Sequence, residues 1–503
     1  MENLIFGILT IFLCAAGYFF SWQLFQKNNL KHAILLLIFC GILLRTYVAT
    51  DFYLHSWDER YHALVAKNLI KHPLIPTLYD KPVLPYDYKN WTGNHIWVHK
   101  QPLPLWTMAV SLWLFGINEI ALRIPSIILS TIGIWLIYLI GRNLFDKKVG
   151  FIAAFLYSIH GLIIEMTGGR VATDHIDIFF LFFVELAVLF AVKFAQNKKI
   201  IYNFLCGISV GAAILSKWLP ALIVLPLWFL FVIDSKKFTS KEILVNFILL
   251  CLMVLITFVP WQLYIYNIFP LEAKWESAFN LKHITEVLDK LGGPFYYHFG
   301  KIRIIFGELS YLPIVWFMWE TVKNRRDYKR LALAVWFLIP YLFFSFAKTK
   351  MQGYILFTAP AVFIITAVFW NYLYSRKHII KYKRLTYTIL FLLIALPVRY
   401  SIERIKPFKI RERSPIWASE IKNLKNQFEG NNIILFNSEH PIETMFYTDI
   451  IAYPHIPDKI RLSEIIGKGY KVLINDNGHL DNDIKTMSGI QIVKLTAAAK
   501  AGI

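Results

Sequence analysis

Two adjacent carboxylates, Asp58 and Glu59, stand where a long apolar run, residues 33–49, gives way to polar sequence. Such a boundary is typical of the point at which a chain leaves a bilayer and meets water. Tyr61 and the apolar residues after it at helical spacing predict a short helix on the membrane surface. Paired acids beside lipid cost free energy, and general-base catalysis is one chemistry that would retain them. The alternative is a solvated cap, since acids also suit a helix N-terminus.

Cationic side chains recur beside the ends of other apolar runs, and a second acid, Asp174, lies among them. The cations with this placement are Lys100, Arg170, Lys217, Lys348 and Lys350. Lys and Arg bind phosphate and stabilise the charge that grows on a departing phosphate, while a carboxylate accepts the proton of an attacking hydroxyl. This set predicts transfer of a sugar from a polyprenyl phosphate. Two alternatives stay open: a lysine at a span end also serves as a snorkelling anchor, and Arg170 and Asp174 could pair with each other.

The composition is that of a polytopic membrane protein. Of 503 residues, 57% are hydrophobic and 17% charged, with 41 Phe and 16 Trp, which is more apolar than soluble domains. The formal charge is +20, but Lys and Arg occur in short clusters between apolar runs, a pattern typical of membrane topology that gives no indication of a nucleic-acid partner. The four cysteines all lie within apolar runs, so they indicate neither a disulfide framework nor a zinc motif.

Twelve apolar runs are long enough to cross a bilayer. They lie at about 4–26, 32–50, 121–141, 149–165, 176–195, 200–216, 219–233, 243–265, 303–320, 331–347, 353–373 and 384–398. The first run has no basic residues before it and is expected to be a retained span. A further run, 103–115, is short and predicts a surface or re-entrant helix. If that helix does not cross, every basic cluster falls on the cytoplasmic side, as the positive-inside rule requires.

The expected fold class is mainly α, a polytopic transmembrane bundle of the plasma or inner membrane. The outer loop 51–120, with its two acids, and the other candidate site residues then share the extracytoplasmic face. Residues 1–399 are expected to form the membrane domain and 400–503 a small extracytoplasmic α/β domain, since predicted strands alternate there with helices. The expected strands are 433–436, 450–453, 471–474 and 490–495, and the expected helices are 416–428, 441–447 and 461–466.

The order of motifs resembles the GT-C class of membrane glycosyltransferases, and within it the lipid A aminoarabinose transferases and bacterial relatives of protein O-mannosyltransferases. The resemblance covers most of residues 32–375. The motifs that carry it are Asp58-Glu59-Arg60-Tyr61, Lys-x-Pro-Leu at 100–103, Arg-x-x-x-Asp at 170–174, Ser-Lys-x-x-Pro at 216–220, Gly-Pro-Phe-Tyr-Tyr at 293–297 and Lys-x-Lys-x-x-x-Tyr at 348–354.

The resemblance implies a GT-C-like bundle and an inverting transfer from a polyprenyl-phosphate sugar to a lipid, glycan or protein acceptor. It implies Asp58 as the catalytic base and Asp174 as a second acid that orients sugar or acceptor. The residues that would position acceptor or donor are Glu59, Tyr61, Tyr296 and Tyr354. The candidates for binding the phosphate are Lys100, Arg170, Lys217, Lys348 and Lys350.

The sequence departs from the aminoarabinose transferases at His99, where they usually carry a glutamate that can hold a metal. A histidine can ligate zinc, so His99 is a candidate ligand; the sequence establishes no cofactor and leaves a divalent metal ion open. Two other functions also stay open: a lipid-linked sugar transporter or flippase, and a glycan polymerase or ligase with a pyrophosphate-linked donor. Gathering of the ionisable residues at one membrane edge favours the enzyme over a transporter, whose polar groups typically lie at mid-depth.

Overall fold

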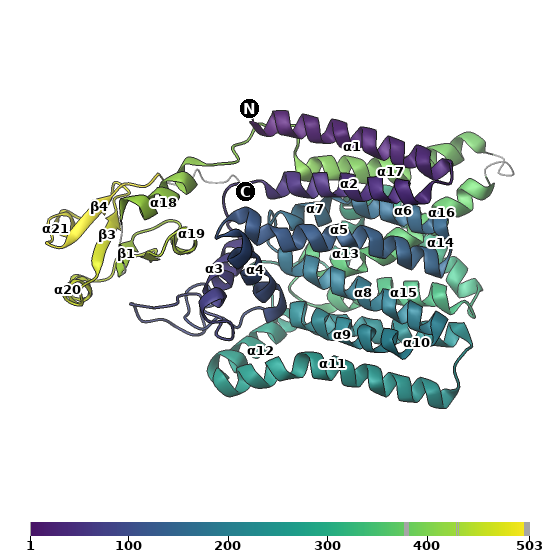
Figure 1. Ribbon diagram of the computed structural model, residues 1–503, viewed down its shortest axis with the longest axis horizontal. Helices are drawn as coiled ribbons and strands as arrows, with labels where there is room; N and C mark the ends of the chain where they lie inside the picture. The colour runs from purple at the N-terminus through teal and green to yellow at the C-terminus, as the bar shows by residue number, and fades with distance from the viewer. Residues whose placement is uncertain (1, 377–381, 429, 431, 497–503) are drawn as a thin grey trace.

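Apolar helices make up most of the chain, because backbone polar groups inside a bilayer must be paired within their own segment. In the computed structural model, which describes residues 2–376, 382–428, 430 and 432–496, these helices lie side by side in one bundle (Figure 1). Nine helices among the described residues are long and apolar enough to cross a membrane. They are α1 (Glu2–Gln26), α2 (Leu30–Ala49), α5 (Glu119–Leu144), α8 (His175–Asn197), α9 (Ile200–Lys217), α11 (Ser240–Ile268), α15 (Tyr328–Phe346), α16 (Ala359–Arg376, with the preceding 3-10 turn Gln352–Thr358) and α17 (Lys383–Ile405). The predicted mainly helical class is confirmed.

The predicted run 149–165 is bent. It divides into α6 (Lys147–Ser158) and α7 (Gly161–Thr167), whose axes differ by 52°. The His160 ring caps α7 by accepting a hydrogen bond from the Ile163 N–H. Capping of this kind satisfies a backbone donor that the break exposes.

The run 303–320 is also interrupted. It lies in α13 (Tyr297–Phe306) and α14 (Tyr311–Lys323), with a 3-10 turn at Glu308–Ser310 between them. Gly307 has a φ of +97°, a left-handed conformation that ends α13. The run 219–233 forms a 3-10 turn (Leu219–Ile223) followed by α10 (Val224–Ser235).

The connections between helices fall into two groups at opposite ends of the bundle (Figure 1). At one end lie α3 (Asp58–Lys71), α4 (Pro102–Phe115), α12 (Pro270–Thr285) and the C-terminal sheet, and at the other end lie the α1–α2 and α10–α11 connections. This grouping agrees with the loop sets that the positive-inside rule predicts. Helix α4 has 14 residues, fewer than the ~20 that cross a bilayer.

The C-terminal region forms a small parallel sheet with strand order β2-β1-β3-β4. Its strands are β1 (Ile433–Phe436), β2 (Ile451–Ala452), β3 (Lys471–Asn475) and β4 (Ile490–Val493), and its helices are α18 (Ile416–Gln427), α19 (Pro441–Tyr447), α20 (Lys459–Gly467) and the short α21 (Asn482–Lys485). In register, Leu435 pairs with Leu473 of β3 and Ile434 with Ile451 of β2. All four residues of β1 are buried, as expected for a strand covered on both faces. Helix α17 continues to Ile405, past the predicted domain boundary at 399.

The C-terminal region and the outer loop 51–120 share one hydrophobic core. Within it, Tyr79 stacks on Tyr453 with ring centroids 5.0 Å apart, and the Tyr79 hydroxyl donates to the Ala452 carbonyl at 3.0 Å. Packing of this kind fixes the loop helices α3 and α4 against a second rigid unit.

We expect Gly150→Ala to destabilise the bundle. A Cβ at Gly150 would lie 2.5 Å from the Tyr138 carbonyl oxygen on α5, and overpacking typically costs about 1–3 kcal/mol. The measurement is the thermal unfolding midpoint of the purified full chain. Gly300→Ala on α13 is the matched control, because the nearest atom to its new Cβ, from Tyr296, is 3.9 Å away. Equal midpoints for both variants would contradict close α5–α6 packing.

Candidate active site

Helix α3 begins at Asp58, so the first two residues of the helix are the predicted pair of acids. Acidic side chains stabilise a helix N-terminus, where unpaired N–H groups and the dipole are positive. The Asp58 carboxylate stays partly exposed, and its Oδ2 lies 3.5 Å from the Lys100 Nζ. Two of the predicted site residues from different parts of the outer loop therefore meet at an accessible point.

Glu59 points the other way, into the protein. Its carboxylate is fully buried; it accepts from Arg123 Nε at 2.7 Å and from Arg123 Nη2 at 2.9 Å. His175 Nε2 lies 3.1 Å from Glu59 Oε1, and the His55 backbone N–H donates to Oε2 at 2.7 Å. Burial opposes ionisation, but the charge of Arg123 and the hydrogen bonds from His175 and Arg123 hold the pKa of Glu59 well below its usual range. The expectation that Glu59 positions the acceptor directly does not fit this enclosure.

Asp174 is fully buried and pairs with His62, whose Nδ1 lies 3.1 Å from its Oδ1. His62 follows Asp58 by four residues, so both side chains lie on one face of α3. Burial opposes ionisation of Asp174, yet the charge and hydrogen bond of His62 lower the pKa of the carboxyl. Asp174 is therefore joined to α3 through His62.

Arg170 does not pair with Asp174, so that alternative is wrong. Its Nε bonds Asp51 Oδ2 at 2.9 Å, and its Nη1 donates to the Ile405 carbonyl at 3.1 Å. Asp51 also accepts from Arg411 Nη2 at 2.7 Å. Burial opposes ionisation of Asp51, but the His55 hydrogen bond and the charges of Arg170 and Arg411 keep the pKa of this carboxyl well below its usual range. Arg170 is thus held by a buried carboxylate that it shares with Arg411, which argues against its predicted role in binding phosphate.

Sequence reasoning missed Asp177, which lies one turn into α8 and is 3% exposed. Its carboxylate forms an ion pair with Lys217 from the end of α9. The Lys217 ammonium lies 5.0 Å from the centre of the Tyr354 ring, within cation–π range. The sequence feature that could have identified Asp177 is its position as an acid inside an apolar run, three residues after Asp174.

The two lysines of the 348–354 motif have different environments. Lys350 is 4% exposed, and its Nζ donates to the carbonyls of Ser345 at 2.6 Å and Ala347 at 2.7 Å, at the end of α15. Burial and the charge of Lys348 lower the pKa of Lys350. A lysine on the last carbonyls of a helix is a C-terminal cap, so Lys350 is occupied. Lys348 is exposed and forms no ion pair within the described part of the chain.

Two predicted tyrosines lie apart from the charged groups. Tyr61 is buried and makes an edge contact with Trp91, with ring centroids 5.0 Å apart. Tyr296 is 67% exposed. Tyr61 therefore supports the loop, and Tyr296 faces outward.

His99 does not fit a metal site. Its Nδ1 lies 2.9 Å from Glu276 Oε2, both groups are buried, and its ring stacks on Trp91 at 4.5 Å. Burial and the charge of Lys100 lower the pKa of His99 although Glu276 opposes this. Across the described residues no group of three or more His, Cys, Asp or Glu side chains is placed to hold a metal ion. His99 is therefore explained by its pairing with Glu276 and its aromatic contacts.

The family described as dolichyl-phosphate-mannose-protein mannosyltransferase matches residues 99–261. An uncharacterized protein of Aquifex aeolicus is 26% identical over 62% of this chain and 59% of its own length. The undecaprenyl phosphate-α-4-amino-4-deoxy-L-arabinose arabinosyl transferase 1 of Pseudomonas fluorescens is 26% identical over 53% of this chain and 48% of its own length. The chain thus spans about half the length of the curated relatives it matches.

Two solved structures share the fold across most of the chain. ArnT from Cupriavidus metallidurans bound to undecaprenyl phosphate has a TM-score of 0.61 at 14% identity, covering 86% of this chain and 88% of that one. The archaeal oligosaccharyltransferase AglB from Archaeoglobus fulgidus, in complex with an inhibitory peptide and a dolichol-phosphate, has a TM-score of 0.56 at 15% identity, covering 85% and 65%. The resemblance to the GT-C class of membrane glycosyltransferases is confirmed, and the protein is an integral membrane protein.

We expect Glu59→Gln to lower stability at neutral pH and to flatten its dependence on pH. Breaking a buried ion pair costs about 3–5 kcal/mol. Because the folded pKa of Glu59 is depressed, its contribution is complete above the ordinary value of about 4.3 and is lost as pH falls below that value. Thermal midpoints of the wild type should fall from pH 5 to pH 3, and those of the variant should fall less. Glu412→Gln, an exposed change, is the control; equal slopes for Glu59→Gln and wild type would contradict the ion pair.

Proposed function

We propose that the protein is an inverting glycosyltransferase that moves a sugar from a polyprenyl phosphate to an acceptor hydroxyl at the extracytoplasmic face. The observation that carries the proposal is the placement of Asp58: an accessible carboxylate at the end of a membrane bundle, beside Lys100. A second cation, Lys217, lies with Asp177 and Tyr354 at the same end. The names of the relatives and the bound polyprenyl phosphates of the structural neighbours support the donor class.

In the proposed reaction Asp58 accepts the proton of the acceptor hydroxyl as its oxygen attacks the anomeric carbon. The bond from that carbon to the phosphate oxygen breaks, and its electron pair leaves with the polyprenyl phosphate. A single displacement of this kind inverts the anomeric centre. Cations beside the leaving phosphate lower the barrier because its negative charge increases in the transition state.

The structure supports three cations for the phosphate side and argues against two. The side chains of Lys100 and Lys217 are each about one quarter exposed although each pairs with an acid, and Lys348 is exposed. Arg170 pairs with the buried Asp51, and Lys350 donates to backbone carbonyls. Glu59 and Asp174 take positioning roles, since each holds α3 through a buried partner.

The acceptor hydroxyl can belong to a lipid, a glycan or a protein. The proposal does not take the identity of the sugar from any relative. The arrangement of charges does not depend on that choice, because Asp58 and the cations act on the hydroxyl, the anomeric carbon and the phosphate alone.

We expect Asp58→Asn to reduce transfer by about 10²–10⁴-fold, the usual contribution of a general base. Purified protein is incubated with undecaprenyl-phosphate sugars carrying aminoarabinose or a hexose, and with membranes from a strain lacking the gene as acceptor source. Release of undecaprenyl phosphate is followed. Asp87→Asn, an exposed acid in the same loop, should keep wild-type rates. Full activity of a folded Asp58→Asn variant would remove Asp58 as the base. Release with no acceptor product would favour hydrolysis, and no release at all would favour transport.

We expect Lys217→Met to raise the donor KM about 10–100-fold, as hydrogen bonds to charged groups contribute about 1.5–3 kcal/mol. The single change also leaves Asp177 buried without its partner and should lower the thermal midpoint. The double variant Asp177→Asn/Lys217→Met removes both charges, so it should regain stability while keeping the high donor KM. If the double variant also regains the wild-type KM, Lys217 serves only to neutralise Asp177.

A further inference from the structure

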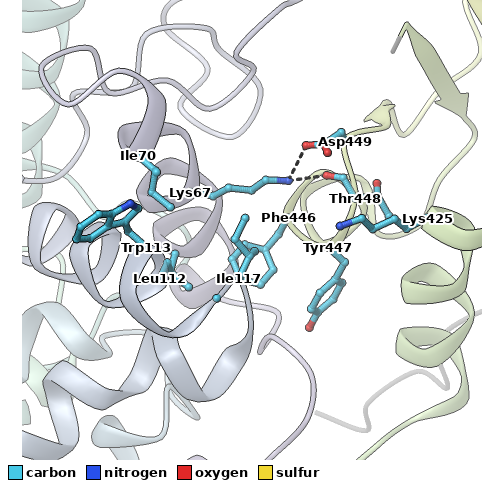
Figure 2. Close-up of a pocket in the computed structure, with 11 residues that line it drawn as sticks. Lys67, Ile70, Leu112, Trp113, Ile117, Lys425, Phe446, Tyr447, Thr448 and Asp449 are labelled. Atoms are coloured by element: carbon cyan, nitrogen blue, oxygen red, sulfur yellow. Dashed lines mark hydrogen bonds and ion pairs between the residues drawn. The ribbon is translucent and has the colours of Figure 1, made fainter. Parts of the chain in front are cut away.

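A cleft of about 420 Å³ lies between the outer loop and the C-terminal region (Figure 2). One wall comes from α3, the end of α4 and the turn after it, and the other comes from α18 and the end of α19. Lys67 in this cleft comes nine residues after Asp58 on α3, a rise of about 13 Å along the helix axis. The cleft is therefore separate from the candidate active site, and its role is independent of the proposed function.

Hydrogen bonds fix the two walls relative to each other. Lys67 Nζ crosses from α3 to donate to the carbonyls of Met445 at 2.8 Å and Thr448 at 2.6 Å. Nearby, Glu119 Oε1 accepts from the Tyr447 hydroxyl and from Lys422 Nζ, both at 2.7 Å. The cleft is thus a built part of the fold, because these bonds hold it at a fixed width.

One side of the cleft is apolar and reaches the level of the bilayer. Leu112 and Phe446 form a buried floor, while Trp113 is 70% and Ile117 45% exposed. Figure 2 shows Trp113, Leu112 and Ile117 on the wall opposite Lys425. These residues directly precede Glu119, where a helix long enough to span the membrane begins. Trp is favoured at the membrane–water interface, so the exposed Trp113 beside this span suits the apolar wall to contact with lipid.

The other side of the cleft is cationic. Lys425 is exposed and forms no ion pair with any described residue, and Lys67 lies across from it. Burial, together with the charges of Lys71 and Lys425, lowers the pKa of Lys67 to about 8, although Asp449 opposes this. Asp449 is the one carboxylate among the cleft residues, at 3.4 Å from Lys67 Nζ. Among the lining residues, the ammonium groups of Lys67 and Lys425 outnumber the Asp449 carboxylate, so the rim has a net positive charge that favours an anion.

We infer that this cleft binds the head group of an anionic membrane phospholipid. The phosphate lies on Lys425, the exposed cation of the rim, and the first methylene groups of the lipid lie against Trp113 and Ile117. A lipid matches both halves of the cleft, since it brings negative charge and apolar chain to the same boundary. Its binding joins the C-terminal region to the bilayer beside α4.

The test compares lipids and variants of the full chain in detergent. Thermal midpoints are measured with added phosphatidylglycerol, phosphatidylcholine or glycerol 1-phosphate, and native mass spectrometry counts bound phosphatidylglycerol. The wild type should be stabilised by phosphatidylglycerol alone. Lys425→Glu should bind phosphatidylglycerol at least about fivefold more weakly, the effect of one surface cation. Lys468→Glu, an exposed cation on α20's C-terminal flank, should behave as wild type, and both variants should keep transferase activity.

Three outcomes would overturn the inference. Equal stabilisation by phosphatidylcholine would show that the charge plays no part. Equal stabilisation by glycerol 1-phosphate would show a site for free phosphate and not for lipid. Equal loss of phosphatidylglycerol in Lys425→Glu and Lys468→Glu would show a general charge effect. If Lys425→Glu changes the basal midpoint, the count of bound lipid in Lys425→Gln decides the same question.

Discussion

A fully buried carboxylate is tolerated only when it is paired, and Glu59 meets that condition through Arg123 of α5 and His175 of α8. The three residues join a surface helix to two helices of the bundle. Ser126 supports the same cluster, since its hydroxyl lies 2.9 Å from His175 Nδ1. Because α3 cannot leave this position without exposing or unpairing Glu59, the neighbouring Asp58 is held at a fixed point on the rim of the bundle.

The need to pair buried charges also distinguishes the cations that can bind phosphate from those that already have partners. A Lys or Arg whose donors are all taken by acids or carbonyls contributes little further attraction for phosphate, because its charge is already compensated. Arg170 is held by the buried Asp51 carboxylate and Lys350 by carbonyls at the end of α15, whereas Lys348 is exposed. Lys217 lies between the two cases: Asp177 compensates it, yet its side chain remains partly exposed next to Tyr354. Partial exposure allows an incoming phosphate to compete for the ammonium.

Hydropathy and charge predicted the bundle, the non-crossing helix α4 and the strands and helices of the C-terminal region, because burial and propensity act locally in the sequence. The pairing of side chains that are distant in the sequence could not be predicted in this way. A pair between Asp174 and Arg170 was one alternative, but the partner of Asp174 is His62, which is 112 residues away. Asp177 was overlooked since one acid in an apolar run has no local partner. His99 suggested a metal until the fold brought Glu276 to its Nδ1. Which of several cations is free depends on such long-range partners.

Helix geometry determines which surroundings each residue of the motif 58–61 contacts. Successive residues of a helix point about 100° apart, so four neighbours at the start of α3 reach four different environments. Asp58 faces the rim, Glu59 the bundle, Arg60 the C-terminal region through Glu443 at 3.4 Å, and Tyr61 the aromatic packing of the loop. Arg60 and Tyr61 also contact each other, since Arg60 Nη2 donates to the Tyr61 hydroxyl at 3.3 Å, whereas Asp58 and Glu59 have separate partners. That separation makes Asp58 the member whose loss should affect chemistry without detaching the helix.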